Sequence, residues 1–299
     1  MKNTSLGAHK GVGRPTRPWI RRVTVPLVLL AVAAAAVVAF GGTGHAIYNG
    51  SPVDNNQFPW VVQVRWRNGV WCGGSLIRSD AVLTAAHCVQ HGAGGARVIT
   101  LPFVHRRSTP VRAMAVPTAA TSQWGGYTGD AGCTARDDIA ILWMKSSLQI
   151  TPVPLALADR PPEGSSVTPM GFGANNRPAD NDVALCGHGW PRQPASTFPR
   201  SLLAATATVT SSTACSTADP PGDRFAFAPE TQLCVNGGGA SINHGDSGGP
   251  LVWNGSLAGV ASTFLTGPPY LDGFTSVAAE TSWLQAQLAA QPVAVPHRA

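Results

Sequence analysis

From residue 58 onward the chain alternates short apolar runs with turn-forming residues. Examples of these runs are residues 60–64, 81–83, 139–142, 205–209 and 257–261. Runs of this length, separated by glycine and proline and lacking a helical repeat, predict many β-strands arranged as a barrel or a sandwich. A helical repeat occurs near the end, over residues 278–290, where Trp283, Leu284 and Leu288 are spaced to share one face.

Three segments interrupt this regular pattern. Residues 123–136 and residues 173–199 are irregular, the second being rich in Gly, Pro, Asn and Asp, and both are predicted to be surface loops. A loop as long as the second is uncommon in a compact domain unless it is functional or mobile. Residues 291–299 contain two prolines and are predicted to form a flexible tail.

The N-terminal segment has the layout of an export signal. Residues 1–22 carry six basic and no acidic side chains, and residues 23–40 form an apolar run of eighteen. A basic region followed by an apolar one is typical of a secretory signal peptide. Small residues at Gly44 and Ala46 favour cleavage before Ile47, so the signal is predicted to span residues 1–46. An apolar run of this length also fits a retained membrane anchor, which stays an alternative.

The charge of the chain gives no sign of a nucleic acid partner. The 21 basic residues exceed the 15 acidic ones by six, and six of the basic residues lie in the leader. The mature chain is therefore balanced and has no basic stripe. At about 250 residues it is long enough for one large all-β unit or two small ones.

All six cysteines follow the leader. They are Cys72, Cys88, Cys133, Cys186, Cys215 and Cys234. An even number of cysteines in an exported chain predicts disulfide bonds. Metal binding is the competing interpretation, but no Cys-x-x-Cys spacing occurs. We therefore expect no metal and no other cofactor.

Three segments carry residues suited to nucleophilic catalysis. His87 ends a run of small residues, Asp138 stands at the start of an apolar strand, and Ser247 lies in Gly-Asp-Ser-Gly-Gly-Pro at residues 245–250. A serine hydroxyl is a weak nucleophile at neutral pH, so it needs an imidazole to take its proton and an acid to orient that imidazole. A buried structural histidine, a strand-end cap and a turn serine are the alternatives.

These segments resemble those of the chymotrypsin/trypsin-type serine peptidases, in that family's order of His, Asp and Ser. Residues 72–77, 170–173 and 259–262 also match the family pattern, so the resemblance covers nearly the whole mature chain. We expect a secreted member of the bacterial type.

The resemblance implies an all-β fold within residues 47–290. It consists of two six-stranded antiparallel β-barrels, residues 47–158 and 159–277, followed by the C-terminal helix. The site is expected in the cleft between the barrels.

The resemblance also assigns roles. His87 would be the general base, Asp138 its orienting acid and Ser247 the nucleophile. Asp137 is the rival of Asp138, which we prefer because the family acid directly precedes the apolar strand. The N–H groups of Gly245 and Ser247 would form the oxyanion hole, and glycine leaves that loop free to turn its N–H toward the substrate.

A further pair connects the nucleophile to the leader. In the resembling family a new N-terminal ammonium, usually on Ile or Val, inserts beside the acid that precedes the nucleophile, here Asp246. Ile47 begins a matching Ile-Tyr-Asn-Gly segment and follows the predicted cleavage site. Signal removal by itself would then produce the active form. The alternative is that Ile47 is an ordinary strand residue after a short propeptide.

The disulfide pairing implied by the resemblance joins Cys72 to Cys88 and Cys215 to Cys234. The remaining two cysteines lie in the irregular loops and match no common family bridge. A bond between them stays open.

The specificity pocket departs from the family pattern. Asn243 replaces the usual cysteine four residues before the nucleophile, and Ser241 stands where trypsin-like enzymes hold an acid. Asp272 either lines the pocket base or, as we favour, lies in a solvated turn. Ser262 and Phe264 belong to the pocket wall, where Phe264 would narrow the entrance. A small or medium apolar residue is expected before the scissile bond.

Together these features predict a secreted, monomeric serine endopeptidase acting on proteins or peptides, without stable membrane association after signal cleavage. A catalytically silent homologue that acts by binding is the alternative, although no residue of the triad is missing. An α/β-hydrolase esterase is disfavoured because that fold needs its histidine after the serine, where the chain offers His297 in the tail.

Overall fold

The computed structural model describes residues 47–66, 71–89, 95–100, 107–118, 120, 136–174, 201–218, 227–264 and 269–290. The predicted signal at residues 1–46, the tail at 291–299, and both Cys133 and Cys186 lie outside the described residues. Among the residues described, no helix is long and apolar enough to cross a membrane.

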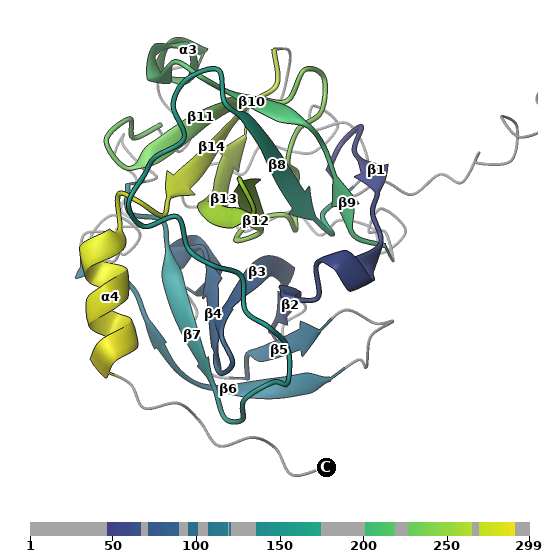
Figure 1. Cartoon of the computed structure of the whole chain (residues 1–299), viewed down its shortest axis with the longest axis vertical. Coiled ribbons are helices and arrows are strands. Elements are labelled where there is room, and N and C mark those ends of the chain that lie inside the picture. Colours follow the sequence, from purple (N-terminus) through teal and green to yellow (C-terminus); the bar gives the residue numbers. More distant parts are fainter. Residues whose placement is uncertain are drawn as a thin grey trace, which may run out of the picture. The chain divides into compact units, whose positions relative to one another are not determined.

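The first barrel is closed and antiparallel, in the strand order β2-β3-β4-β7-β6-β5 (Figure 1). Its strands are β2 (Val61–Arg65), β3 (Trp71–Arg78), β4 (Ala81–Thr84), β5 (Arg97–Thr100), β6 (Ser108–Ala115) and β7 (Ala140–Met144). The apolar runs of the sequence form its interior, because β4 and β7 are buried at every position.

The second barrel closes in the same way, because β8 pairs with both β10 and β12. Its strands are β8 (Ser166–Gly171), β10 (Ala207–Thr210), β11 (Gln232–Asn236), β12 (Pro250–Trp253), β13 (Ser256–Phe264) and β14 (Leu271–Ser276). The prediction of two six-stranded antiparallel barrels is thereby confirmed.

The N-terminal segment lies with the second barrel, although the sequence analysis assigned residues 47–158 to the first. The strand β1 (Ser51–Pro52) pairs with β9 (Leu203–Ala204), which extends the sheet beyond β8. Ile47 is fully buried and belongs to the core cluster of the second barrel. The mature N-terminus predicted from the sequence therefore lies in the barrel that also carries Ser247.

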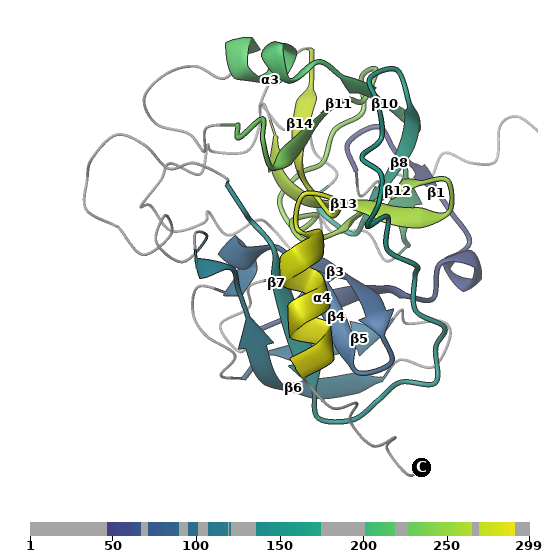
Figure 2. The ribbon, with the colours of Figure 1, turned by 60° about the vertical axis from the view of Figure 1, so that its left-hand side comes forward.

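The C-terminal helix returns to the first barrel after the last strand of the second. It runs over α4 (Thr281–Ala290), three residues later than predicted, because residues 277–280 form a turn closed by the Glu280 N–H on the Val277 carbonyl at 3.2 Å. Leu284 is fully buried in the first barrel's core. Figure 2 shows α4 lying along that barrel.

The sequence analysis missed the short helix α3 (Ser212–Ala218). It carries Cys215, which forms a disulfide with Cys234 on β11. Seven residues are too few for a helical repeat to stand out, and the disulfide to the neighbouring strand holds the segment in place.

A buried carboxyl group ties α4 to the first barrel. Asp80 is fully buried and accepts from Arg78 Nε at 2.7 Å, with Arg112 Nη2 at 3.6 Å. Arg78 also donates through Nη1 to the Leu288 carbonyl of α4 at 3.0 Å. A cation at this end of a helix satisfies a carbonyl that has no partner within the helix.

We expect Asp80→Ala to lower the free energy of unfolding by about 2 kcal/mol, because it leaves the two arginines without their buried acceptor. Urea unfolding followed by circular dichroism measures this. Asp159→Ala, at an exposed position, is the control and should change stability by less than about 0.5 kcal/mol. Equal losses of stability in both variants would show that the contacts of Asp80 with Arg78 and Arg112 do not stabilise the fold.

Candidate active site

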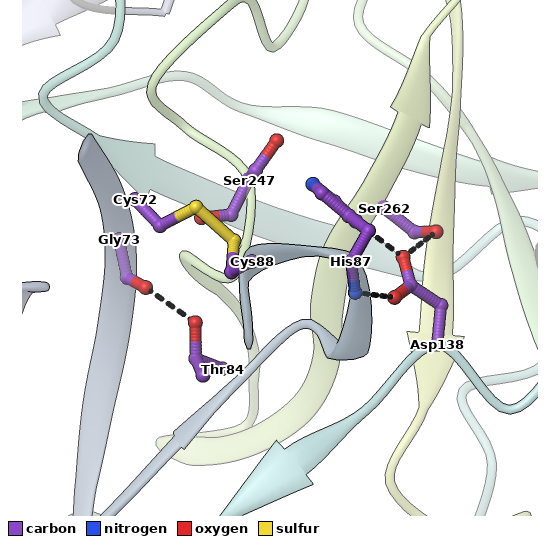
Figure 3. The surroundings of a disulfide bond; sticks show 8 residues. All are labelled: Cys72, Gly73, Thr84, His87, Cys88, Asp138, Ser247 and Ser262. Atoms are coloured by element: carbon purple, nitrogen blue, oxygen red, sulfur yellow. Dashed lines mark hydrogen bonds and ion pairs between the residues drawn. A yellow bond between two sulfur atoms is a disulfide. The ribbon is translucent and has the colours of Figure 1, made fainter. Parts of the chain in front are cut away.

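The three predicted triad residues reach one site from both barrels. His87 lies in η2 (Ala86–Val89), directly after β4, and Asp138 lies just before β7. Ser247 lies in the turn that leads into β12 of the second barrel. Figure 3 shows the three side chains gathered beside the Cys72–Cys88 disulfide.

Asp138 holds the His87 ring and main chain at once. Its Oδ2 lies 2.8 Å from His87 Nδ1, and its Oδ1 accepts the His87 N–H at 2.9 Å. Burial alone raises the pKa of Asp138, but the charge of His87 and the hydrogen bonds from His87 and Ser262 outweigh it, so the pKa lies below its ordinary value. The ionised carboxylate favours a proton on Nδ1, which leaves Nε2 to accept one.

Asp137, the rival acid, adopts φ 51°, and its main-chain N–H donates to Thr231 Oγ1 at 3.4 Å. The contacts with the His87 ring and with its main-chain N–H both come from the Asp138 carboxyl group. The residue that contacts His87 is therefore Asp138.

Ser247 is fixed next to the histidine segment through its main chain. Its carbonyl accepts the Gly73 N–H at 2.7 Å, and Cys88 Sγ lies 3.7 Å from the same oxygen. Thr84 in turn donates to the Gly73 carbonyl at 2.9 Å. In Figure 3 the Ser247 side chain and the outer nitrogen of the His87 ring are directed to the same region.

The turn around Ser247 leaves two N–H donors available. Gly245 has φ 94°, a conformation that favours glycine. The Asp246 N–H donates to Asn243 at 2.9 Å and the Gly249 N–H to Asp246 at 2.7 Å, whereas in the described part of the chain the N–H groups of Gly245 and Ser247 have no protein acceptor. Two such donors can receive an oxygen on which negative charge develops.

Asp246 is buried in a cradle of main-chain donors. Its carboxyl oxygens accept the N–H of Gly173 at 2.7 Å and that of Asn243 at 2.9 Å. A Cβ at Gly171 or Gly173 would come within 1.9 or 2.5 Å of the carboxyl atoms, so only glycine fits there. Burial raises the pKa of Asp246 to about 7, against the lowering effect of the two N–H groups.

The segment that starts at Ile47 runs against the residues before Ser247. The Ser241 N–H donates to the Tyr48 carbonyl at 3.2 Å, and the Asn49 side chain donates to the Gly239 carbonyl at 2.9 Å. Ile47 itself has φ 46°. A β-branched residue in this left-handed region is strained.

Asp272 is not a solvated turn residue, so the interpretation that we favoured from the sequence is wrong. It lies on β14 and is 1% exposed. Its Oδ1 accepts the Ser241 hydroxyl at 2.7 Å and its Oδ2 the Ile242 N–H at 3.1 Å. Burial raises the pKa of Asp272 well above its ordinary value, although both hydrogen bonds lower it.

The pocket-wall residues differ in where their side chains lie. The Ser262 hydroxyl donates to Asp138 Oδ2 at 2.6 Å, so it supports the acid rather than the pocket wall. Phe264 pairs with Asp272 across β13 and β14. Its ring meets the His244 ring edge to face, with centroids 5.5 Å apart. The sequence analysis did not single out His244, because this contact depends on how the strand registers against the nucleophile segment.

The cysteines beside the histidine do not form a metal site. Cys72, His87 and Cys88 place their ligand atoms within 4.8 Å of one another. The two sulfurs are joined as a disulfide, however, and a metal ion requires thiolates.

Comparisons with known proteins find similar serine proteases. Serine protease SP24D of Anopheles gambiae is 29% identical over 254 residues, which is 81% of each chain. The structure of neuropsin, a mouse serine protease, has a TM-score of 0.64 at 23% identity and covers 81% of this chain and 100% of its own. An inactivated protease paralogue of the scabies mite also has a TM-score of 0.64, at 20% identity, covering 81% of this chain and 97% of its own.

These relatives are animal proteins, so the bacterial subtype expected from the sequence finds no support. The family model described as Trypsin matches residues 47–284. Since the match covers most of the chain, this protein belongs to the trypsin family of serine proteases.

Proposed function

We propose that this protein is a secreted serine endopeptidase that hydrolyses peptide bonds through an acyl-enzyme on Ser247. The proposal rests above all on the buried 2.8 Å contact between His87 Nδ1 and the ionised Asp138. The fold by itself is insufficient support, because the inactivated mite paralogue shares it. What favours activity is that His87, Asp138 and Ser247 are all present and come together.

In this mechanism Ser247 Oγ attacks the scissile carbonyl carbon while His87 Nε2 takes the hydroxyl proton. The carbonyl oxygen becomes negative and binds the N–H groups of Gly245 and Ser247, each donor lowering the barrier by about 3 kcal/mol. The C–N bond then breaks as His87 returns the proton to the leaving amine. Water, deprotonated by His87, releases the acyl group and restores Ser247.

Ser247→Ala should reduce kcat by about 10⁵-fold or more without changing the unfolding temperature, because the nucleophile is lost and the packing is kept. Hydrolysis of casein peptides measures this, together with mass-spectrometric detection of a covalent fluorophosphonate adduct. Ser256→Ala, at the half-buried start of β13, is the matched control and should keep both the hydrolysis of peptides and the formation of the adduct. A wild-type protein that forms no adduct would favour the silent binding homologue.

We infer that the active form begins at Ile47. Ile47 is buried while it is still joined to residue 46, and in this state its φ is 46°. This left-handed conformation costs about 1–3 kcal/mol of strain. Cleavage of that peptide bond removes the restriction. It also creates an ammonium group in the barrel where Asp246 is buried without a cationic side chain in the described part of the structure. A positive charge beside this carboxyl would lower its pKa and order the Ser247 turn.

N-terminal sequencing of the secreted active protein should therefore start at Ile47. A form that retains two residues before Ile47 should fold but have about 100-fold lower kcat/KM, since leaving a buried charge unpaired costs about 3 kcal/mol. The two forms are compared at equal active-site concentration, which is determined by titration with the fluorophosphonate. Equal activity of the two forms would contradict the pairing of Ile47 with Asp246.

We propose further that Asp272 forms the base of the substrate pocket, together with Ser241 and with Phe264 at its wall. A buried acid with a raised pKa is stabilised in its charged form by a cation, so the pocket favours Lys or Arg before the scissile bond. This reverses the apolar preference expected from the sequence.

Profiling with a peptide library should show cleavage after Arg and Lys. Asp272→Asn should lower the kcat/KM for substrates with Arg before the scissile bond, relative to those with Leu, by about 100-fold, because one buried ion pair with the substrate is lost. Asp159→Asn is the control at an exposed site. An unchanged Arg-to-Leu ratio in Asp272→Asn would show that another group sets the preference.

A further inference from the structure

The balanced charge of the chain after residue 46 conceals a separation of charge within it. Residues 55–129 carry seven arginines and one acid, Asp80, whereas the rest of this part of the chain carries eight basic and fourteen acidic residues. None of the six strands of the first barrel contains an acid. Asp80 itself lies in the turn between β3 and β4 and is fully buried. The strands of the first barrel therefore present cations and no anions.

Strand pairing gathers four of these cations into a row. Arg65, at the end of β2, lies directly opposite Arg97 of β5, and Arg97 lies opposite Pro110 of β6. Arg112 follows two residues further along β6, and the Lys145 N–H, just after β7, donates to the Pro110 carbonyl at 2.9 Å.

We call Arg65, Arg97, Arg112 and Lys145 the basic row. It crosses three gaps between neighbouring strands, a width of about 14 Å at about 4.8 Å per gap. The sequence analysis found no basic stripe, because these residues are spread over residues 65–145 and only the pairing of the strands brings them together.

The side chains of the basic row lie on the outer face of the barrel. Their neighbours Val64, Val98 and Val111 belong to the core cluster, and successive residues of a strand point to opposite faces. The members of the row are exposed, apart from Arg65, which is half-buried. Figures 1 and 2 show β5 and β6 on the side of the first barrel that faces away from the second barrel. A partner bound there would leave the proposed triad open.

Neutral groups hold two of these cations in place. The guanidinium carbon of Arg65 lies 3.3 Å from the centre of the Trp71 ring. Arg97 donates through Nε to the Ser108 hydroxyl and through Nη2 to the Ser108 carbonyl, both at 2.6 Å. A ring, a hydroxyl and a carbonyl fix the direction of a guanidinium group without cancelling its charge. The row is therefore ordered and remains positive.

The one acid of this region cannot balance the row. Asp80 is shared by two arginines, with Arg78 Nε at 2.7 Å and Arg112 Nη2 at 3.6 Å. Like charges that face each other directly across two strands, as Arg65 and Arg97 do, destabilise the sheet. An anion bound to both would turn this repulsion into attraction.

We propose that the basic row binds a sulfated polysaccharide. Guanidinium groups hold the oxygens of such anions with two parallel N–H donors. A linear chain of sulfate groups can also follow a row across the outside of a barrel without inserting into it. Its binding does not depend on the proposed peptidase function.

Other anionic partners fit this surface less well. Within the described residues, Met114 is the only large hydrophobic side chain that is exposed. The surface therefore lacks the apolar anchors with which a protein enters a membrane interface. It also lacks the exposed aromatic rings on which the bases of a single-stranded nucleic acid stack.

Isothermal titration calorimetry with a heparin oligosaccharide tests the proposal. The protein is used in the form that begins at Ile47, because the six basic residues of the leader would bind the same ligand, and residues 44–299 form a compact unit of their own. Arg97→Gln and Lys145→Gln should each weaken binding about tenfold, because each removes a charged contact with sulfate. Arg97→Lys should retain more affinity than Arg97→Gln. Arg136→Gln, which removes an exposed cation outside the row, is the matched control and should bind like wild type.

Salt and competing ligands separate a sulfated polysaccharide from other polyanions. The affinity of wild type should fall as the NaCl concentration rises, and the slope of log affinity against log salt should be smaller by about one in Arg97→Gln. The same oligosaccharide without its sulfate groups should not bind. Equal affinity of wild type, Arg97→Gln and Lys145→Gln, at unchanged unfolding temperatures, would overturn the proposal. Duplex DNA that binds as tightly as the heparin oligosaccharide would also overturn it, in favour of a nucleic acid partner.

Discussion

The structure depends on keeping one negative charge, that of Asp138, buried where the two barrels meet. The donors to its carboxylate come from both sides: His87 from the first barrel and Ser262 of β13 from the second. Thr275 of β14 also donates to the main-chain carbonyl of Asp138. An unpaired carboxylate in this position would cost several kcal/mol. The association of the two barrels and the orientation of the His87 ring are therefore energetically coupled. The helix α4, which leaves the second barrel and packs on the first, reinforces the same junction.

The sequence predicted what depends on local pattern. Short apolar runs with turns between them specify strands, and the motifs around His87 and Ser247 are contiguous, so both were visible without a structure. Asp272 and Ser262 were misplaced because their surroundings depend on strand register. A bulge interrupts the β13–β14 pairing between Ala261 and Thr263, and a shift of one residue exchanges the faces of a strand. The Ser262 hydroxyl consequently points to Asp138, and Asp272 contacts Ser241 from a strand that is distant in sequence.

Three buried acids near Ser247 show how partners decide the sign of a pKa shift. Burial raises the pKa in each case, yet the net shift is downward for Asp138 and upward for Asp246 and Asp272. The difference is the positive partner: His87 faces Asp138, whereas in the described part of the chain the other two accept only uncharged donors. Positions where a fold buries acids without cations are those where a cation from elsewhere is most strongly bound. An N-terminal ammonium and a basic substrate side chain are two such cations.

Strain lies beside these acids as well. Ile47 and Asp137 are both non-glycine residues with positive φ, and each is held by contacts near the site. Ile47 is held by core packing, and Asp137 by main-chain hydrogen bonds to Ile139 and Thr231. A strained backbone persists only where surrounding contacts determine it. In the proposed activation, a cut before Ile47 removes one of these strains and adds a positive charge. Asp246, the carboxyl group that this charge would meet, accepts the N–H groups of Gly173 and Asn243 and directly precedes Ser247. In that proposal the fold alone does not determine activity, because the order of the Ser247 turn depends on a charge that the uncut chain lacks.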